Sequence, residues 1–301
     1  RASLTPDLYR ESYAKLFEGA AEWRALRGEA TALFPWSANS TFICKPPFFD
    51  GVPKEPAPLR DLKGMRALAI LGDMVTTDHL SPNNTIAADS PAARYLTERG
   101  VQPADFQTHG FRRGNHEMAL RGTFASNRLK NEIVPGMEGP YTKVQPEGTV
   151  VPIFDAAAAY RSRGVPLIVF AGREYGAGSS RDWAAKGPAL LGVRAVVAES
   201  FERIHRNNLI GMGVLPLELK GVRRADLRLD GTESFDVTGI EHDLKPHVEL
   251  ALRIHRASSA IDEVKVTCRI DTAEELLYYQ HGGLLPYVYR ELVARISPVS
   301  E

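Results

Sequence analysis

The sequence predicts an α/β fold with a mixed sheet. Three apolar segments, 167–171, 193–198 and 214–219, have the length and the branched side chains of buried strands. The segments that separate them have apolar residues at helical spacing, and strands that alternate with helices pair in parallel. Later in the chain, polar and apolar residues alternate at 248–254 and 264–270, which indicates a hairpin with one exposed face.

The texture of the sequence divides the chain into three parts. Residues 1–64 are predicted to be the end of a preceding domain and an extended linker, because six prolines lie between residues 35 and 58. Residues 65–225 contain the alternating strands and helices. Residues 226–301 are predicted to form a small α+β extension, a hairpin followed by helices, packed on that domain. The chain starts at Arg1 without a methionine or a signal-like segment, so we expect a piece of a longer protein.

The composition excludes several classes of protein. Of the 301 residues, 37 are Lys or Arg and 37 are Asp or Glu, so no net charge draws the chain to nucleic acid or to an anionic membrane. No apolar run approaches the ~20 residues of a membrane span. Cys44 and Cys268 are far apart and have no metal-ligand spacing. We therefore expect two reduced thiols, no metal site in this chain, and a cytoplasmic location.

The main candidate site follows the apolar strand at 167–171. A loop with Gly176 and Gly178 leads to Ser179, Ser180 and Arg181, where a helix should start. A helix N-terminus attracts anions, and a guanidinium matches a carboxylate, so we expect a carboxylate pocket that contains a serine. In open α/β sheets, ligands bind beyond the carboxyl ends of the strands, which is where this loop falls. The alternative is a simple N-cap serine after a glycine turn.

A second polar cluster follows the apolar segment at 67–71. It includes Thr76, Thr77, Asp78 and Ser81, and it could also be a hydrogen-bonded turn and nothing more. Basic residues are frequent at 112–130, and such residues are most often solvated surface charges.

Five segments in this order resemble the aconitase family, in its aconitase A and iron-regulatory-protein branch. They are Gly-Asp-Met-Val-Thr-Thr-Asp-His-Leu-Ser-Pro (72–82), Arg-Arg-Gly-Asn-His-Glu (112–117), Arg-Gly-Thr-Phe-Ala (121–125), Gly-Ala-Gly-Ser-Ser-Arg-Asp-Trp-Ala-Ala-Lys-Gly (176–187) and Glu-Arg-Ile-His-Arg-Asn-Asn-Leu-Ile-Gly-Met-Gly (202–213). The resemblance covers residues 40–294. It implies that residues 65–225 are the C-terminal swivelling β/β/α domain of that family.

The resemblance also implies an activity, that of an iron–sulfur hydro-lyase that interconverts citrate and isocitrate through cis-aconitate. It gives Ser179 the role of the base and places Asp78 at the catalytic site. Substrate carboxylates would be bound by residues matching Ser180, Arg181, Arg128 and Ser81. The cysteines that hold the family's [4Fe–4S] cluster lie in preceding domains, and Cys44 and Cys268 do not match them. The chain alone is therefore expected to bind no cluster and to act as a lid that carries the base and the carboxylate clamps.

Three alternatives remain open on the sequence. Dehydration of 2-methylcitrate needs nearly the same motifs, and one methyl group changes binding by only ~1–3 kcal/mol. RNA binding, as in iron-regulatory proteins, would use exposed arginines, for which the candidates are Arg99, Arg112, Arg113, Arg128 and Arg181. The zero net charge argues against it. A separate isomerase subunit, as in isopropylmalate isomerase, would not need the long proline-rich linker.

Overall fold

The computed structural model describes residues 5–14, 16–28 and 31–296. The chain divides into two units, residues 1–36 and residues 37–301. The first unit contains α1 (Pro6–Ala14) and α2 (Ala21–Ala25), and neither helix has a buried residue. Thr5 precedes α1 and accepts a hydrogen bond from the Leu8 amide, which is the contact of a helix N-cap.

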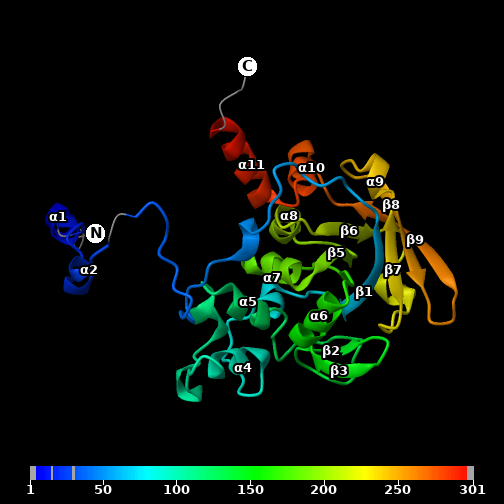
Figure 1. The fold of residues 1–301 in the computed structure, drawn as a ribbon, viewed down its shortest axis with the longest axis horizontal. Helices are drawn as coiled ribbons and strands as arrows, with labels where there is room; N and C mark the ends of the chain where they lie inside the picture. The colour runs from blue at the N-terminus through cyan, green and yellow to red at the C-terminus, as the bar shows by residue number, and fades with distance from the viewer. Residues whose placement is uncertain (1–4, 15, 29–30, 297–301) are drawn as a thin grey trace. The chain divides into compact units, whose positions relative to one another are not determined.

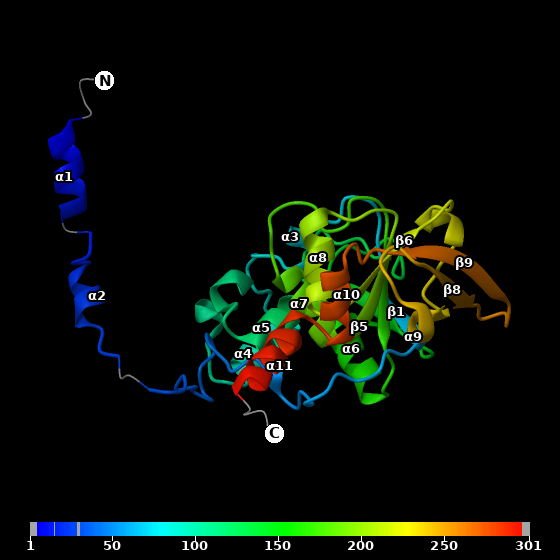
Figure 2. The same cartoon turned by 90° about the horizontal axis from the view of Figure 1, so that it is seen from above.

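The second unit is built on a closed barrel of mixed strands (Figures 1 and 2). In order around the barrel, the strands are β1 (Leu62–Ile70), β4 (Leu167–Ala171), β5 (Val193–Ala198), β6 (Leu215–Leu219), β9 (Ile261–Cys268), β8 (Glu249–His255) and β7 (Ser234–Thr238). The first four pair in parallel, and every other pairing is antiparallel. The predicted mixed α/β sheet is therefore confirmed.

Helices cover the outer side of the parallel strands. Figure 1 shows α6 (Ile153–Ser162), α7 (Trp183–Leu191) and α8 (Arg203–Gly211) on one side of these strands and the β7–β9 strands on the other. The remaining α-helices are α3 (Thr77–Leu80), α4 (Pro91–Thr97), α5 (His116–Gly122), α9 (Ile240–Asp243), α10 (Ala273–Gln280) and α11 (Leu284–Ile296). Short 3-10 turns lie at Pro47–Phe49, Pro103–Asp105, His109–Arg112 and Arg224–Leu227, and a separate ribbon consists of β2 (Tyr141–Val144) and β3 (Thr149–Pro152). No helix among the described residues is long and apolar enough to cross a membrane.

Two apolar cores lie on the two faces of β4, and this explains why β4 is an unbroken apolar run. Ile168 and Phe170 point into the barrel, where the Phe170 ring lies 4.8 Å from the Phe235 ring. The alternate residues Leu167, Val169 and Ala171 pack against the covering helices. A parallel strand that is buried on both faces needs apolar side chains at every position.

Several predicted elements agree with the structure, to within one residue for β4, β5 and β8 and to within three for β9. The strands predicted at 167–171 and 193–198 are β4 and β5, and the predicted hairpin is formed by β8 and β9. Gly192 ends α7 in the left-handed conformation, with φ 102°. Four short elements, β2, β3, β7 and α5, were not predicted from the sequence.

The strands after residue 225 belong to the same sheet as those before it. β9 pairs with β6, and β7 pairs with β1, so the predicted extension fills both edges that the parallel strands would otherwise expose. The predicted domain limits at residues 64 and 225 stay predictions. The barrel, however, contains strands from both sides of residue 225.

A buried ion pair joins α8 to α10. The Arg206 guanidinium donates to both carboxylate oxygens of Glu275 at 2.8 Å, and its Nε lies 3.3 Å from Asp271. The side chains of Arg206 and Glu275 are only 7% and 11% exposed. Removal of one partner of such a pair strongly destabilises the fold, because the other charge is left buried and unpaired.

We expect Glu275→Gln to lower the free energy of unfolding by about 3 kcal/mol, since Arg206 would then be buried without a counter-charge. Urea denaturation measures this. Glu263→Gln is the matched control, because its partner Arg253 is half exposed. An equal loss in the two variants would show that burial of the Arg206 pair does not matter.

We also expect the chain to lose stability as the pH falls from 7 to 5. Burial lowers the pKa of His109 and of His205 to about 4, whereas an unfolded histidine titrates near ~6.5. Between these values only the unfolded state takes up the proton, so acidification favours unfolding, by on the order of 2 kcal/mol per histidine at pH 5. Urea midpoints at pH 7, 6 and 5 should fall less steeply for His205→Gln than for the unsubstituted chain. Equal slopes would contradict this assignment.

Candidate functional site

Two loops leave the barrel side by side, because β1 and β4 pair in parallel and end together. Ile70 lies opposite Phe170 in the register of the two strands. Beyond the strands, the Gly172 amide donates to the Gly72 carbonyl at 3.0 Å. The polar cluster that follows β1 and the glycine loop that follows β4 therefore start as neighbours.

The two loops remain joined as far as Ser179. The Gly176 amide donates to the Val75 carbonyl at 2.8 Å, and the Thr77 amide donates to the Ala177 carbonyl at 2.9 Å. The Thr77 hydroxyl then donates to the Ser179 carbonyl at 2.7 Å. Gly176 adopts φ 84°, a conformation that favours glycine. The backbone of Ser179 is thus fixed by hydrogen bonds from the facing loop.

Ser179 and Ser180 lie in the loop before α7 and not in its first turn, which corrects the predicted helix start. The helix begins at Trp183, and the amides of Ala184 and Ala185 already donate to the carbonyls of Arg181 and Asp182. These amides are therefore not free to bind an anion at Ser179. Both serines are exposed, and their hydroxyls make no hydrogen bond to another residue in the described part of the chain.

Arg181 connects the glycine loop to α3. Its Nη1 lies 2.5 Å from a carboxylate oxygen of Asp78 and donates to the Ser81 carbonyl at 2.8 Å. The Arg181 side chain is 22% exposed, whereas Asp78 is 67% exposed. A hydrogen-bonded capping box between Thr76 and His79 fixes the short helix that carries Asp78. The structure therefore brings together three of the six predicted site residues, Asp78, Ser81 and Arg181.

Arg128 lies on a third loop that reaches the same region. It lines an open depression of about 540 Å³ together with Asp78 and His79. This loop is fixed to the end of α3, because the Phe124 amide donates to the Leu80 carbonyl at 2.9 Å. The guanidinium of Arg128 is exposed. An anion in the depression could therefore contact the Arg128 guanidinium, which is accessible to solvent.

Three asparagine side chains that line this depression were not predicted from the sequence. Asn83, Asn84 and Asn127 lie on its wall with the residues already named. Asn84 also donates from its side chain to the Ala125 carbonyl at 3.0 Å, so it helps to hold the Arg128 loop. Their only signal in the sequence is their position beside the Asp78 and Arg128 motifs.

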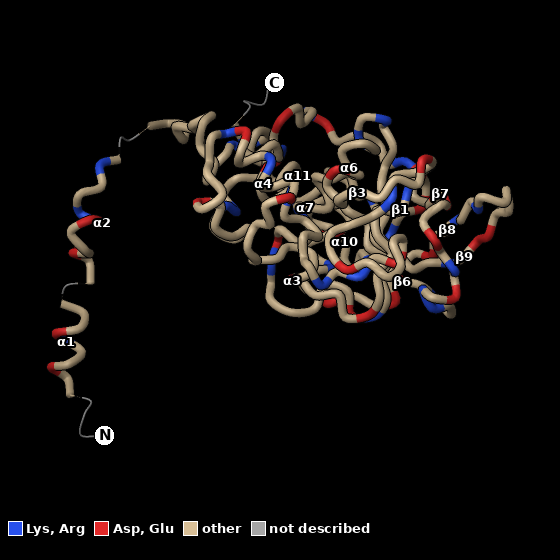
Figure 3. The backbone as a smooth tube through the Cα atoms, turned by 90° about the horizontal axis from the view of Figure 1, so that it is seen from below, with Lys and Arg blue, Asp and Glu red and all other residues tan. Residues whose placement is uncertain are grey.

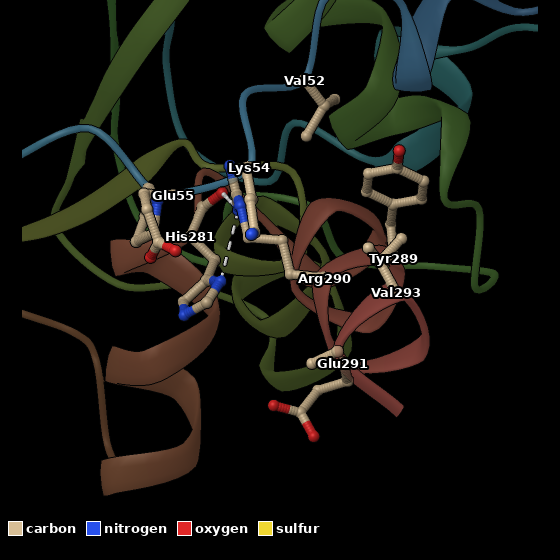
Figure 4. A pocket seen from close by; sticks show the side chains of 10 residues that line it. Val52, Lys54, Glu55, His281, Tyr289, Arg290, Glu291 and Val293 are labelled. Carbon is tan, nitrogen blue, oxygen red and sulfur yellow. Dashed lines mark hydrogen bonds between the residues drawn. The ribbon is translucent and has the colours of Figure 1, made fainter. Parts of the chain in front are cut away.

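The largest hollow described lies elsewhere, between the linker and α11 (Figure 4). Its volume is about 630 Å³, and none of the predicted site residues lines it. Arg290 donates to the His281 carbonyl at 2.9 Å and to the Pro53 carbonyl at 3.1 Å. Figure 4 shows the Arg290 side chain reaching His281. The bond to Pro53 fastens the linker to α11, and the hollow lies between these two segments.

The cysteines of this chain do not fit an iron–sulfur cluster. Such clusters are held by several thiolates. Cys268 is completely buried in the barrel core, and burial raises the pKa of its thiol to about 11. Burial also raises the pKa of Cys44. The described residues contain no group of three or more His, Cys, Asp or Glu side chains that could hold a metal ion.

Comparison with known proteins finds similar sequences over nearly the whole chain. Residues 92–221 match the model of the aconitase C-terminal domain. Aconitate hydratase A of Escherichia coli strain K12 is 51% identical over 96% of this chain and 32% of its own length. The enzymes of the same name from Pseudomonas aeruginosa and Thermus thermophilus are 50% and 49% identical, over 95% and 96% of this chain and 32% of their own lengths.

The chain thus spans about a third of the length of these relatives. The crystal structure of a 3-isopropylmalate dehydratase from Methanocaldococcus jannaschii is 18% identical over 78% of this chain and 98% of its own, with a TM-score of 0.39, which is too low to support a conclusion. The identity to aconitate hydratase A extends over nearly the whole of this chain. The chain therefore belongs to the aconitase family and contains its C-terminal domain.

Proposed function

We propose that this chain is the C-terminal part of an aconitate hydratase, a hydro-lyase that interconverts citrate and isocitrate through cis-aconitate. One observation carries the proposal: Arg181 follows the exposed Ser179 by two residues and is held by Asp78 and by the Ser81 carbonyl. Asp78 in turn lines an open depression together with Arg128. The relatives that share half of its residues are named for that activity.

Two guanidiniums suit a substrate with several carboxylates. Arg128 is exposed in the depression, and Arg181 has further N–H donors beyond those that contact Asp78 and Ser81. A planar guanidinium binds a carboxylate through two parallel hydrogen bonds, which fixes the orientation of the substrate as well as its charge. We assign the binding of substrate carboxylates to these two arginines, with the hydroxyls of Ser180 and Ser81 as further donors.

Ser179 is the proposed base that removes a proton from a substrate carbon. A serine hydroxyl is a weak base, so its deprotonated form needs positive charge nearby. The amides that follow Trp183 do not supply this charge, because they already bond to carbonyls. Arg181 is the group in this loop that can supply it, and Asp78 holds its guanidinium in place.

The rest of the protein must supply what this chain does not contain. We infer that the [4Fe–4S] cluster of the complete enzyme takes its ligands from outside these 301 residues, since Cys44 and Cys268 do not fit it. This chain would then be a swivelling lid that acts on the tricarboxylate together with the preceding, cluster-binding domains. By itself it should turn over no substrate. A cytoplasmic location belongs to the same proposal and agrees with two free thiols.

The structure weakens the RNA-binding alternative. Arg112 is 1% exposed, and its guanidinium donates to the carbonyls of Asp105 and Phe106, so it is not available to phosphates. Arg99 is stacked on the Tyr95 ring at 3.6 Å. In the view of Figure 3, acidic and basic residues are interspersed along the backbone and form no basic stripe.

Steady-state kinetics of the complete enzyme on citrate and on 2-methylcitrate test the choice between the two substrates. We expect the larger kcat/KM for citrate. A larger value for 2-methylcitrate would assign the protein to propionate breakdown and leave the proposed base and clamps unchanged.

Ser179→Ala in the complete enzyme should lower kcat by about 10³-fold or more and leave KM within a few-fold, because the base acts only in the chemical step. Ser162→Ala on α6 is the control, since its hydroxyl only donates to the Ala159 carbonyl. Near-normal turnover of Ser179→Ala would remove this residue from the base role.

Arg181→Lys should lower kcat/KM by about 10²-fold and raise KM, because one ammonium cannot contact Asp78, Ser81 and a substrate carboxylate together. Arg173→Lys is the matched control. Arg173 pairs with Asp73 at the same end of the barrel, but its side chain is 70% exposed and lines another hollow. Equal effects in the two variants would argue against a specific role for Arg181.

A further inference from the structure

His205 is a buried histidine that the proposed chemistry leaves unexplained. It lies in α8 and is 1% exposed, and neither of its ring nitrogens has a hydrogen-bond partner among the described residues. Burial without a partner disfavours its protonated form, so the ring is neutral near pH 7. A leucine would fill such a place without leaving polar atoms unpaired, so the shape of the ring needs an explanation.

The flat ring of His205 lies directly against the glycine loop. A Cβ atom added to Gly176 would fall 2.2 Å from Cγ and Cδ2 of His205. The preceding residue, Tyr175, meets the same ring edge to face, with ring centroids 5.1 Å apart. His205 therefore contacts the backbone and a side chain of the loop three and four residues before Ser179.

The opposite side of the loop is fixed as well. The Gly176 amide donates to the Val75 carbonyl at 2.8 Å, and Thr77 bonds to Ala177 and to the carbonyl of Ser179. The loop is thus clamped between the β1 side and the His205 ring. The thickness of that ring limits how deeply Gly176 can lie, and the position of Gly176 in turn affects the position of Ser179, three residues later.

We propose that His205 is a positioning residue, whose ring fixes the Gly176–Ser179 loop so that the Ser179 hydroxyl is held at the reacting carbon of the substrate. This inference rests on the proposed role of Ser179 as the base. His205 is buried behind the loop, so it acts through the backbone and does not touch substrate. A displacement of about 1 Å in such a group can lower a rate by about 10²-fold.

The test uses the complete enzyme with His205→Ala and His205→Leu. We expect kcat to fall at least about tenfold with KM within about twofold, because binding depends on other residues. Amide hydrogen exchange in the 174–178 segment should accelerate at least about tenfold, since Gly176 loses its support. Leucine fills the volume of the histidine ring, so the leucine variant can still be measured if the alanine variant does not fold.

Ile210→Ala is the matched control, because Ile210 is fully buried on the same helix but packs in the barrel core. It should lower stability with little change in kcat or in exchange of the 174–178 segment. Unchanged kcat in both His205 variants, or a lower kcat without faster exchange in that segment, would overturn the positioning role. If Ser179→Ala keeps its turnover, the proposed base role of Ser179 fails. If Ser179→Ala loses turnover but the His205 variants do not, only the role of His205 is rejected.

Discussion

The parallel pairing of β1 with β4 is the constraint on which the candidate site depends. Once Ile70 and Phe170 are opposite each other, the two chains leave the barrel at the same height. The same offset of one hundred residues then recurs in the bonds between Asp73 and Arg173 and between Ser81 and Arg181. A strand register set by apolar packing therefore determines which polar residues meet outside the sheet.

Most of the barrel could be predicted because its strands are marked by local patterns. β4 and β5 are unbroken apolar runs, and β8 and β9 alternate because one face is solvated. β7 could not be found in this way, since only two of its five residues, Phe235 and Val237, are apolar, and two such residues are too few to mark an alternation. Its place in the barrel comes from pairing with β1, a partner that is distant in the sequence.

The residue types of the candidate site could be read from the sequence, but its geometry could not. The serines and the arginine after β4 indicated an anion site, whereas the contact between the β1 and β4 loops depends on a strand pairing that the sequence did not indicate. The start of α7 could not be fixed, because two glycines with positive φ keep the chain out of the helix until Trp183. The prediction of Arg112 as an exposed arginine was also wrong. Its guanidinium donates a hydrogen bond to the hydroxyl of Thr41, in the linker, at 2.7 Å. Contacts of that range leave no mark in a local pattern.

The closure of the barrel has a consequence for how the chain is made. β1 is among the first parts of the second unit to be synthesised, yet the strand on its other side, β7, comes more than one hundred and fifty residues later. During translation, β1 can pair with β4 while its remaining edge waits without a neighbour. The growing chain thus has an open sheet edge until β7 has emerged from the ribosome.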